Sequence, residues 1–166
     1  VLKNTDIPVT LYKTLTNKPD FAIFFDKDIL LGRYLKLQGI PVFNDPETYK
    51  FELGKGIVLN EGTDVTIVAT GLTVNNSIEA VKMLEADGIS VKLINIHTIK
   101  PIDEELIVAA AKKTGKVVTV EEHSVIGGLG SAVCDVLSEK APTKVMKIGI
   151  NDVFGESGPA LELIKR

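Results

Sequence analysis

The sequence predicts an α/β fold, a three-layer α/β/α domain built on a mostly parallel, five-stranded sheet. Two observations favour it. From Gly56 onward, short apolar runs rich in β-branched residues alternate with amphipathic stretches of helical length. The apolar runs lack polar alternation, which is typical of strands buried on both faces of a parallel sheet. Strands that alternate with helices pack as a sheet covered on both sides.

The first half of this region contains two strands and a helix. Residues 56–64, "GIVLNEGTD", read as a short strand followed by a turn. Residues 64–70, "DVTIVAT", form a buried strand that stops at Gly71. Four apolar residues then recur at helical spacing: Val74, Ile78, Val81 and Leu84. That spacing predicts a helix over residues 74–87, before the Asp87-Gly88 pair.

The second half continues the alternation to the end of the chain. We expect strands at residues 90–96, 116–122 and 144–150, and helices at residues 100–115, 129–140 and 158–166. The helix after Pro101 has acidic residues in its first turn and Lys112 and Lys113 in its last, which matches the helix dipole at both ends.

Residues 1–45 differ from the rest, and we expect them to form a separate lead-in segment before a domain over residues 46–166. Asn44, Asp45 and Pro46 have turn chemistry, and the stretch around them, "FNDPETYKFELGKG", reads as an extended connector. The chain starts with Val1 and not methionine, which favours a piece of a longer protein.

Composition excludes several classes of function. A net charge of −3 without a basic stripe argues against nucleic acid as a partner. No apolar run reaches the ~18–20 residues of a membrane span, and no signal peptide is recognisable, so we expect no membrane partner. Cys134 is the only cysteine, which excludes an internal disulfide and a CxxC metal site. A reducing, cytoplasmic location is the expectation.

Both histidines of the chain fall at the ends of expected strands, where ligands of parallel sheets gather. His97 follows residues 90–96, and Glu121, Glu122 and His123 close residues 116–122. Acid–base chemistry and a structural or interface role are both open for this group. Neighbouring strand residues point to opposite faces, so Glu122 and His123 need not pair. We assign no catalytic, cofactor-binding or metal-binding residue.

Gly127 and Gly128 precede the expected helix over residues 129–140, and Gly130 is its second residue. Exposed backbone N–H groups there could cradle a phosphate, and close packing of the helix explains the glycines equally well. The dinucleotide fingerprint fails because its third glycine position holds Val133. Cys134 lies within the apolar stripe of the same helix and is read as a small core residue.

Several motifs in order resemble the C-terminal domain of transketolase-type, thiamine-diphosphate-dependent enzymes. They are "DVTIVATG", "INIHTIKPIDEE", "VTVEEH", "GGLGSAV" and "DVFGESG", and the resemblance covers about residues 50–166. The residues of these motifs are most similar to those of transketolases, especially their split two-chain forms. The alternatives are a deoxyxylulose-phosphate synthase, a 2-oxo acid dehydrogenase β subunit, which tends to carry Arg-Thr in place of His97-Thr98, or a stand-alone interaction module that lost catalysis.

The resemblance implies a supporting role for this domain. In the whole enzyme, a two-carbon ketol unit moves between sugar phosphates of the pentose phosphate pathway, with thiamine diphosphate and magnesium held by a diphosphate-binding and a pyrimidine-binding domain. The C-terminal domain docks on the latter and contributes to a homodimer, so the isolated fragment is expected to be inactive and to bind no cofactor. The interface candidates are His97, Glu121, Glu122, His123, Gly127, Gly128 and Gly130.

The lead-in segment departs from the family pattern. It is similar to the end of a pyrimidine-binding domain at Tyr34, Pro41 and Val42, but it is far too short to be a complete one. Lys36 replaces one arginine, and Gly39 stands where the substrate-phosphate arginine is expected. Phosphate binding by this segment is therefore left open.

Overall fold

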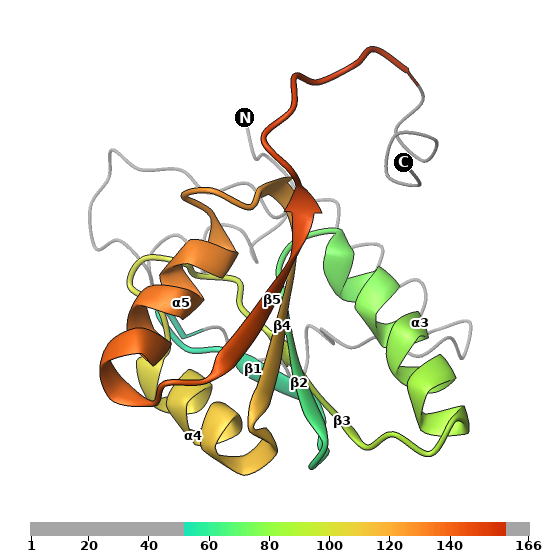
Figure 1. The fold of residues 1–166 in the computed structure, drawn as a ribbon, viewed down its shortest axis with the longest axis vertical. Helices are drawn as coiled ribbons and strands as arrows, with labels where there is room; N and C mark the ends of the chain where they lie inside the picture. Colours follow the sequence, from blue (N-terminus) through green and yellow to red (C-terminus); the bar gives the residue numbers. More distant parts are fainter. Residues whose placement is uncertain (1–51, 159–166) are drawn as a thin grey trace, which may run out of the picture. The chain divides into compact units, whose positions relative to one another are not determined.

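The computed structural model describes residues 52–158 (Figure 1). The whole lead-in segment, the expected domain boundary and the expected final helix after Gly158 lie outside the described residues, and the division at residue 45 stays a prediction. Within residues 52–158, no helix is long and apolar enough to cross a membrane.

The described residues form the predicted three-layer α/β domain. Its sheet has five strands in the order β1-β3-β2-β4-β5. They are β1 (Ile57–Asn60), β2 (Val65–Ala69), β3 (Val91–Asn95), β4 (Lys116–Ser124) and β5 (Lys144–Ile150). Only β1 runs antiparallel to its neighbour, and the other adjacent pairs are parallel. The expected mostly parallel sheet is confirmed.

Three helices connect these strands: α3 (Thr73–Ala86), α4 (Glu104–Thr114) and α5 (Leu129–Lys140). Figure 1 shows α4 and α5 on one side of the sheet and α3 on the other. Two separate apolar clusters correspond to the two sides, one between the sheet and α4 and α5, the other between the sheet and α3.

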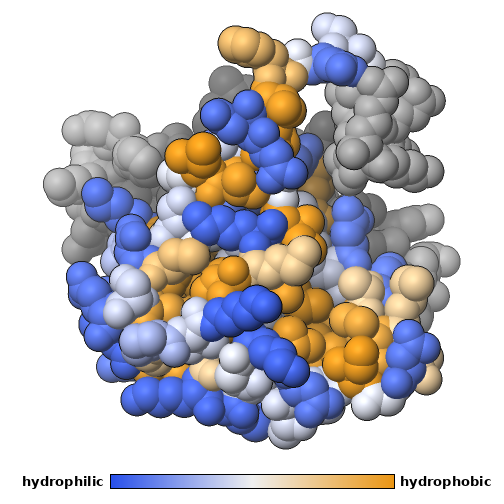
Figure 2. All heavy atoms as spheres, in the orientation of Figure 1, coloured by the Kyte–Doolittle hydropathy of each residue, from blue (hydrophilic) through white to orange (hydrophobic). Residues whose placement is uncertain are grey.

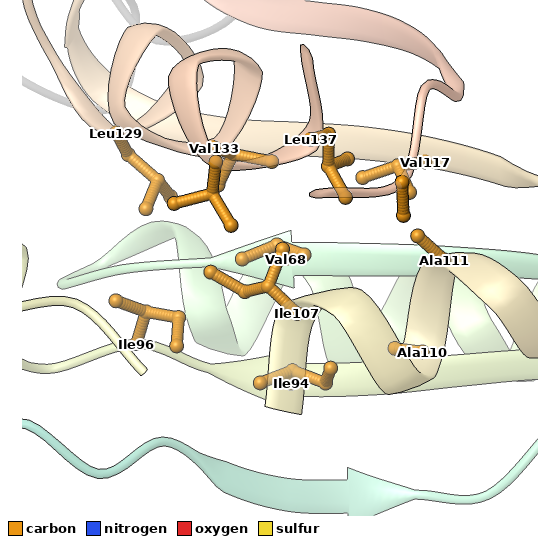
Figure 3. Close-up of a cluster of buried hydrophobic side chains, with 12 residues drawn as sticks. Val68, Ile94, Ile96, Ile107, Ala110, Ala111, Val117, Leu129, Val133 and Leu137 are labelled. Atoms are coloured by element: carbon orange, nitrogen blue, oxygen red, sulfur yellow. The ribbon is translucent and has the colours of Figure 1, made fainter. Parts of the chain in front are cut away.

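The larger cluster lies between the sheet and α4 and α5. In Figure 3, Leu129, Val133 and Leu137 of α5 point toward the sheet, which presents Val68 and Ile94. All five side chains are at most 1 % exposed. Full burial of such a side chain contributes about 1.5–3 kcal/mol, so the spacing that predicts α5 also holds it against the sheet.

Helix α4 begins at Glu104, four residues later than the expected start at residue 100, because Asp103 is its N-cap. The Asp103 carboxylate accepts hydrogen bonds from the backbone N–H of Leu106 at 3.2 Å and of Gly56 at 3.0 Å, so it caps α4 and ties the start of β1 to it. Gly115 ends the helix with a φ of 67°, a left-handed conformation that favours glycine.

Strand β4 is longer than its expected range and ends at Ser124. Its pairing with β5 is regular as far as Val120 and resumes at Ser124, with a shift of register between them. Glu121, Glu122 and His123 therefore lie in the irregular part of the strand, where a bulge can redirect side chains.

The carboxyl edge of the sheet as candidate functional site

The predicted site residues lie at the carboxyl edge of the sheet but belong to different strands. His97 follows β3, whereas Glu121, Glu122 and His123 belong to β4. Strand β2 lies between these two strands, so their ends are separated by two strand spacings of about 4.8 Å each. The structure brings Glu121 and His123 together with the three glycines at the start of α5.

Glu121 is buried and points at the N-terminus of α5. Its carboxylate accepts hydrogen bonds from the backbone N–H of Leu129 at 2.7 Å and of Gly130 at 2.8 Å. Only 3 % of the residue is exposed. The helix dipole and the unpaired N–H groups of a first turn favour a negative charge at this point.

The anion at this helix N-terminus is therefore the chain's own carboxylate. The phosphate-cradle interpretation of the glycines is wrong for the N–H groups of Leu129 and Gly130, because Glu121 occupies them. Sequence reasoning missed this contact, since it links residues eight and nine positions apart through a strand and a loop.

Two of the three glycines are required by close packing. A Cβ at Gly128 would lie 2.0 Å from Oε2 of Glu121, and one at Gly130 would lie 2.8 Å from Oγ1 of Thr119. Gly127 has open space around its Cβ position but a φ of 79°, which favours glycine for backbone reasons. The glycine cluster thus lets α5 begin directly over the Glu121 side chain.

His123 and Glu122 face outward beside this buried group. The His123 side chain is 65 % exposed, and its Nδ1 lies 4.0 Å from Oε2 of Glu121 and 3.0 Å from the carbonyl oxygen of Ser124. Glu122 is also exposed. The nearer carboxylate is therefore that of Glu121, two residues away on the same strand, and not that of Glu122.

The side chain of His97 is more buried than that of His123. Its Nδ1 lies 2.8 Å from Oγ1 of Thr98, and the side chain is half-buried. Burial lowers the pKa of the His97 imidazole below its usual range, because desolvation disfavours the charged form. The neutral imidazole is therefore the favoured form near pH 7.

Exposed apolar side chains also gather at this edge, and sequence reasoning missed them. They come from the segments that follow four of the strands: Leu72, Ile99, Ile126, Val153 and Phe154. Phe154 is fully exposed and Val153 is 68 % exposed. Figure 2 shows apolar side chains at the top of the molecule, around the end of β5. The sequence did carry a signal for this feature. Each of these loops is otherwise polar or contains glycine, and each includes a large apolar residue.

The N-termini of α4 and α5 do not fit the diphosphate of thiamine diphosphate. The N-termini of α4 and α5 already hold the carboxylates of Asp103 and Glu121, which would repel a diphosphate. Within residues 52–158, no three His, Cys, Asp or Glu side chains are grouped so that they could bind a metal ion. Cys134 is a free thiol that is half-buried in α5, not a fully buried core residue.

The fold and its edge define a three-layer α/β domain in which the buried carboxylate of β4 caps the helix that follows it. The chain belongs to the family of transketolase C-terminal domains, whose model matches residues 54–166. This establishes the predicted family and fold.

Relatives and a solved structure agree with this assignment. The chain is 46 % identical over 126 residues to the 6-deoxy-6-sulfo-D-fructose transketolase subunit SqwH of Clostridium sp. (strain MSTE9), over 75 % of this chain and 39 % of that protein. It is 42 % identical over 127 residues to 1-deoxy-D-xylulose-5-phosphate synthase of Heliobacterium modesticaldum, over 76 % of this chain and 20 % of that protein.

The solved structure is a split gene transketolase described as an inactive β4 tetramer. It is 55 % identical, with a TM-score of 0.71, over 75 % of this chain and 41 % of that one. The chain therefore spans about two fifths or less of the length of these proteins.

Proposed function

We propose that the chain serves as the C-terminal domain of a split transketolase, which transfers a two-carbon ketol unit between sugar phosphates. The names of similar proteins support this proposal, since they include a transketolase subunit and a split gene transketolase. The whole enzyme would use thiamine diphosphate and magnesium on its diphosphate-binding and pyrimidine-binding domains. A homodimer and a cytoplasmic location belong to the same proposal.

The role of this domain is to dock on the pyrimidine-binding domain through its carboxyl edge. The exposed apolar side chains of that edge carry the proposal, because exposed apolar side chains that lie at one edge of a domain favour an interaction surface there. His97 and His123 lie at the same edge and would form polar contacts around the apolar ones. Chemistry is left to the other domains, since the N-termini of α4 and α5 already hold carboxylates and no group of described residues could hold a metal ion.

The test is an activity and binding assay with the purified chain. Alone it should transfer no ketol unit, and it should support transfer when combined with the diphosphate-binding and pyrimidine-binding parts of the same enzyme. Phe154→Asp and Ile126→Asp should weaken binding to those parts by at least about tenfold, since each removes apolar contact at the edge.

Met83→Asp is the matched control. Met83 is 70 % exposed and lies in the last turn of α3, away from the carboxyl edge, so this variant should bind as the wild type does. Transfer by the chain alone would refute the proposal. Equal binding by all three variants would refute docking through this edge.

A synthase is the second candidate, favoured by the 42 % identity to 1-deoxy-D-xylulose-5-phosphate synthase. The donor substrate of the reconstituted enzyme separates the two functions. Transfer from a ketose phosphate supports the transketolase, whereas formation of 1-deoxy-D-xylulose 5-phosphate would replace it with the synthase.

A further inference from the structure

Residues 125–128 connect β4 to α5, and we call them the Ile126 loop. The first half of this loop is tied to the end of the sheet. The backbone N–H of Val125 donates to the carbonyl oxygen of Ile150, the last residue of β5, at 3.0 Å. The N–H of Ile126 donates to Oγ of Ser124 at 3.2 Å. These two bonds set the direction in which the chain leaves β4.

The second half of the loop is held by a hydroxyl group and an amino group. Oγ of Ser131, in the first turn of α5, accepts a hydrogen bond from the N–H of Gly127 at 2.9 Å. The same hydroxyl donates to the carbonyl oxygen of Val125 at 3.4 Å. Nζ of Lys147 donates to that carbonyl oxygen at 3.2 Å and to Oγ of Ser131 at 3.3 Å. Lys147 therefore connects β5, the loop and α5.

The path of the Lys147 side chain is set by packing. Its residue pairs with Thr119 of β4, and its stem passes the first turn of α5. A Cβ at Gly130 would lie 2.9 Å from both Cγ and Cδ of Lys147, so the stem occupies the space that this glycine leaves free. Helix α5 is already capped by Glu121. The hydrogen bonds of the lysine amino group thus serve the loop and are not needed to begin the helix.

Gly149 lets the end of β4 and the loop lie directly against β5. A Cβ at this position would lie 2.7 Å from the carbonyl oxygen of His123 and 3.1 Å from Cγ1 of Val125. A backbone oxygen cannot yield to such a contact as a flexible side chain can, so only glycine fits here. The loop is therefore fixed by packing on one side and by hydrogen bonds on the other.

The large side chain that these contacts leave outside is that of Ile126, which is 64 % exposed. The N–H groups of Val125, Ile126 and Gly127 all have partners, so the backbone that carries this isoleucine is held from both ends. An apolar residue on a backbone that is already ordered loses less conformational entropy on binding than one on a flexible loop. The Ile126 loop thus has the properties of a preorganised apolar anchor.

We propose that Lys147 and Ser131 are positioning residues, which hold the Ile126 loop in the conformation that inserts Ile126 among apolar side chains of the pyrimidine-binding domain. This inference rests on the proposed function and deepens it. It names residues that set the affinity of docking through Ile126 and not through contacts of their own with the docked domain.

The first test is the affinity of the purified chain for the pyrimidine-binding part of the same enzyme. Lys147→Met keeps the stem over Gly130 and removes the amino group. It should weaken binding about fivefold, because only a fraction of the loops then has the binding conformation. The urea midpoint should equal that of the wild type, since water can replace the lost hydrogen bonds at this half-buried site. Lys144→Met is the matched control, because it removes an exposed lysine from the other end of β5, and it should bind as the wild type does.

A double-mutant cycle distinguishes positioning from other roles. When Ile126→Ala is already present, adding Lys147→Met should change the affinity by less than about twofold, because no anchor is left to position. Ser131→Ala should behave as Lys147→Met does in the same cycle, and alanine is compatible with its place in the helix. In both variants the amide of Gly127 should exchange its hydrogen at least about fivefold faster, with unchanged exchange in β2.

Several results would overturn the inference. They are additive losses in the cycle, unchanged exchange at Gly127, or an equal loss of affinity in the Lys144→Met control. A lowered urea midpoint with normal binding would assign Lys147 to folding instead. Wild-type chain that does not bind the pyrimidine-binding part rejects the proposed docking and this inference with it. Wild-type binding that neither Lys147→Met nor Ser131→Ala weakens rejects the inference alone and leaves the proposed function in place.

Discussion

The carboxylate of Glu121 is bound to the backbone N–H of Gly130 at 2.8 Å, across the loop between β4 and α5. Together with the bond to Leu129, this contact closes the N-terminus of α5 with a buried negative charge. The segment that resembled an acid–base group followed by an anion cradle is therefore an internal connection between strand and helix. His123 remains exposed beside it.

Replacing Glu121 with alanine should destabilise the domain markedly. The variant leaves two buried N–H groups unpaired and removes the charge that caps α5, a loss of about 1–3 kcal/mol in the free energy of unfolding. Urea denaturation measures it. Glu122→Ala is the control, because that neighbouring side chain is exposed and should change stability by less than about 0.5 kcal/mol. Equal losses in both variants would contradict the capping role.

Gly128→Ala should lower the free energy of unfolding because the new side chain would collide with Glu121. Its new Cβ would lie 2.0 Å from Oε2 of that residue, and overpacking of this kind costs about 1–3 kcal/mol. The penalty should shrink when Glu121→Ala is added, since the colliding atoms are gone. Urea melts of the two single variants and the double variant give the coupling energy. Strict additivity would show that the collision does not decide the cost.

His123→Ala should affect assembly more than folding. The side chain is 65 % exposed, so its removal should change the free energy of unfolding by less than about 0.5 kcal/mol. If His123 contacts the docked domain, binding to the pyrimidine-binding part should weaken at the same time. Thermal melts and binding measurements on the same preparations separate the two effects. A large drop in melting temperature with normal binding would reverse this assignment.

The stability of the domain should depend on pH through His97. Burial lowers its pKa in the folded state, so the unfolded chain binds a proton first as the pH falls. The contribution of neutral His97 to the free energy of unfolding is complete above the pKa of the unfolded state, about 6.5. It is lost as the pH falls toward the lower pKa of the folded state.

His97→Gln should flatten this part of the profile, because glutamine does not titrate. The check is the difference in free energy of unfolding between wild type and variant, followed from about pH 8 to pH 5. A difference that stays constant over this range would contradict the expectation.

Local patterns in the sequence were sufficient for most of the fold. The apolar run at residues 64–70 became β2, and the spacing from Val74 to Leu84 became α3, because each periodicity reports which face of its own segment is buried. The acidic first turn and Gly115 marked the ends of α4 for equally local reasons. The order of the strands carries no such local signal, since it depends on which distant segments pair.

By itself, then, the sequence determined the strands and helices, the parallel class of the sheet, the family and the edge at which polar residues gather. Only the tertiary structure decided that Glu121 turns inward to α5 while His123 stays exposed, and that, within residues 52–158, α3 leaves Met146, Ile148 and Ile150 of β5 exposed. Both outcomes depend on strand register and on the position of a helix over neighbouring strands. Contacts between distant segments set these features, and periodicity within one segment does not encode them.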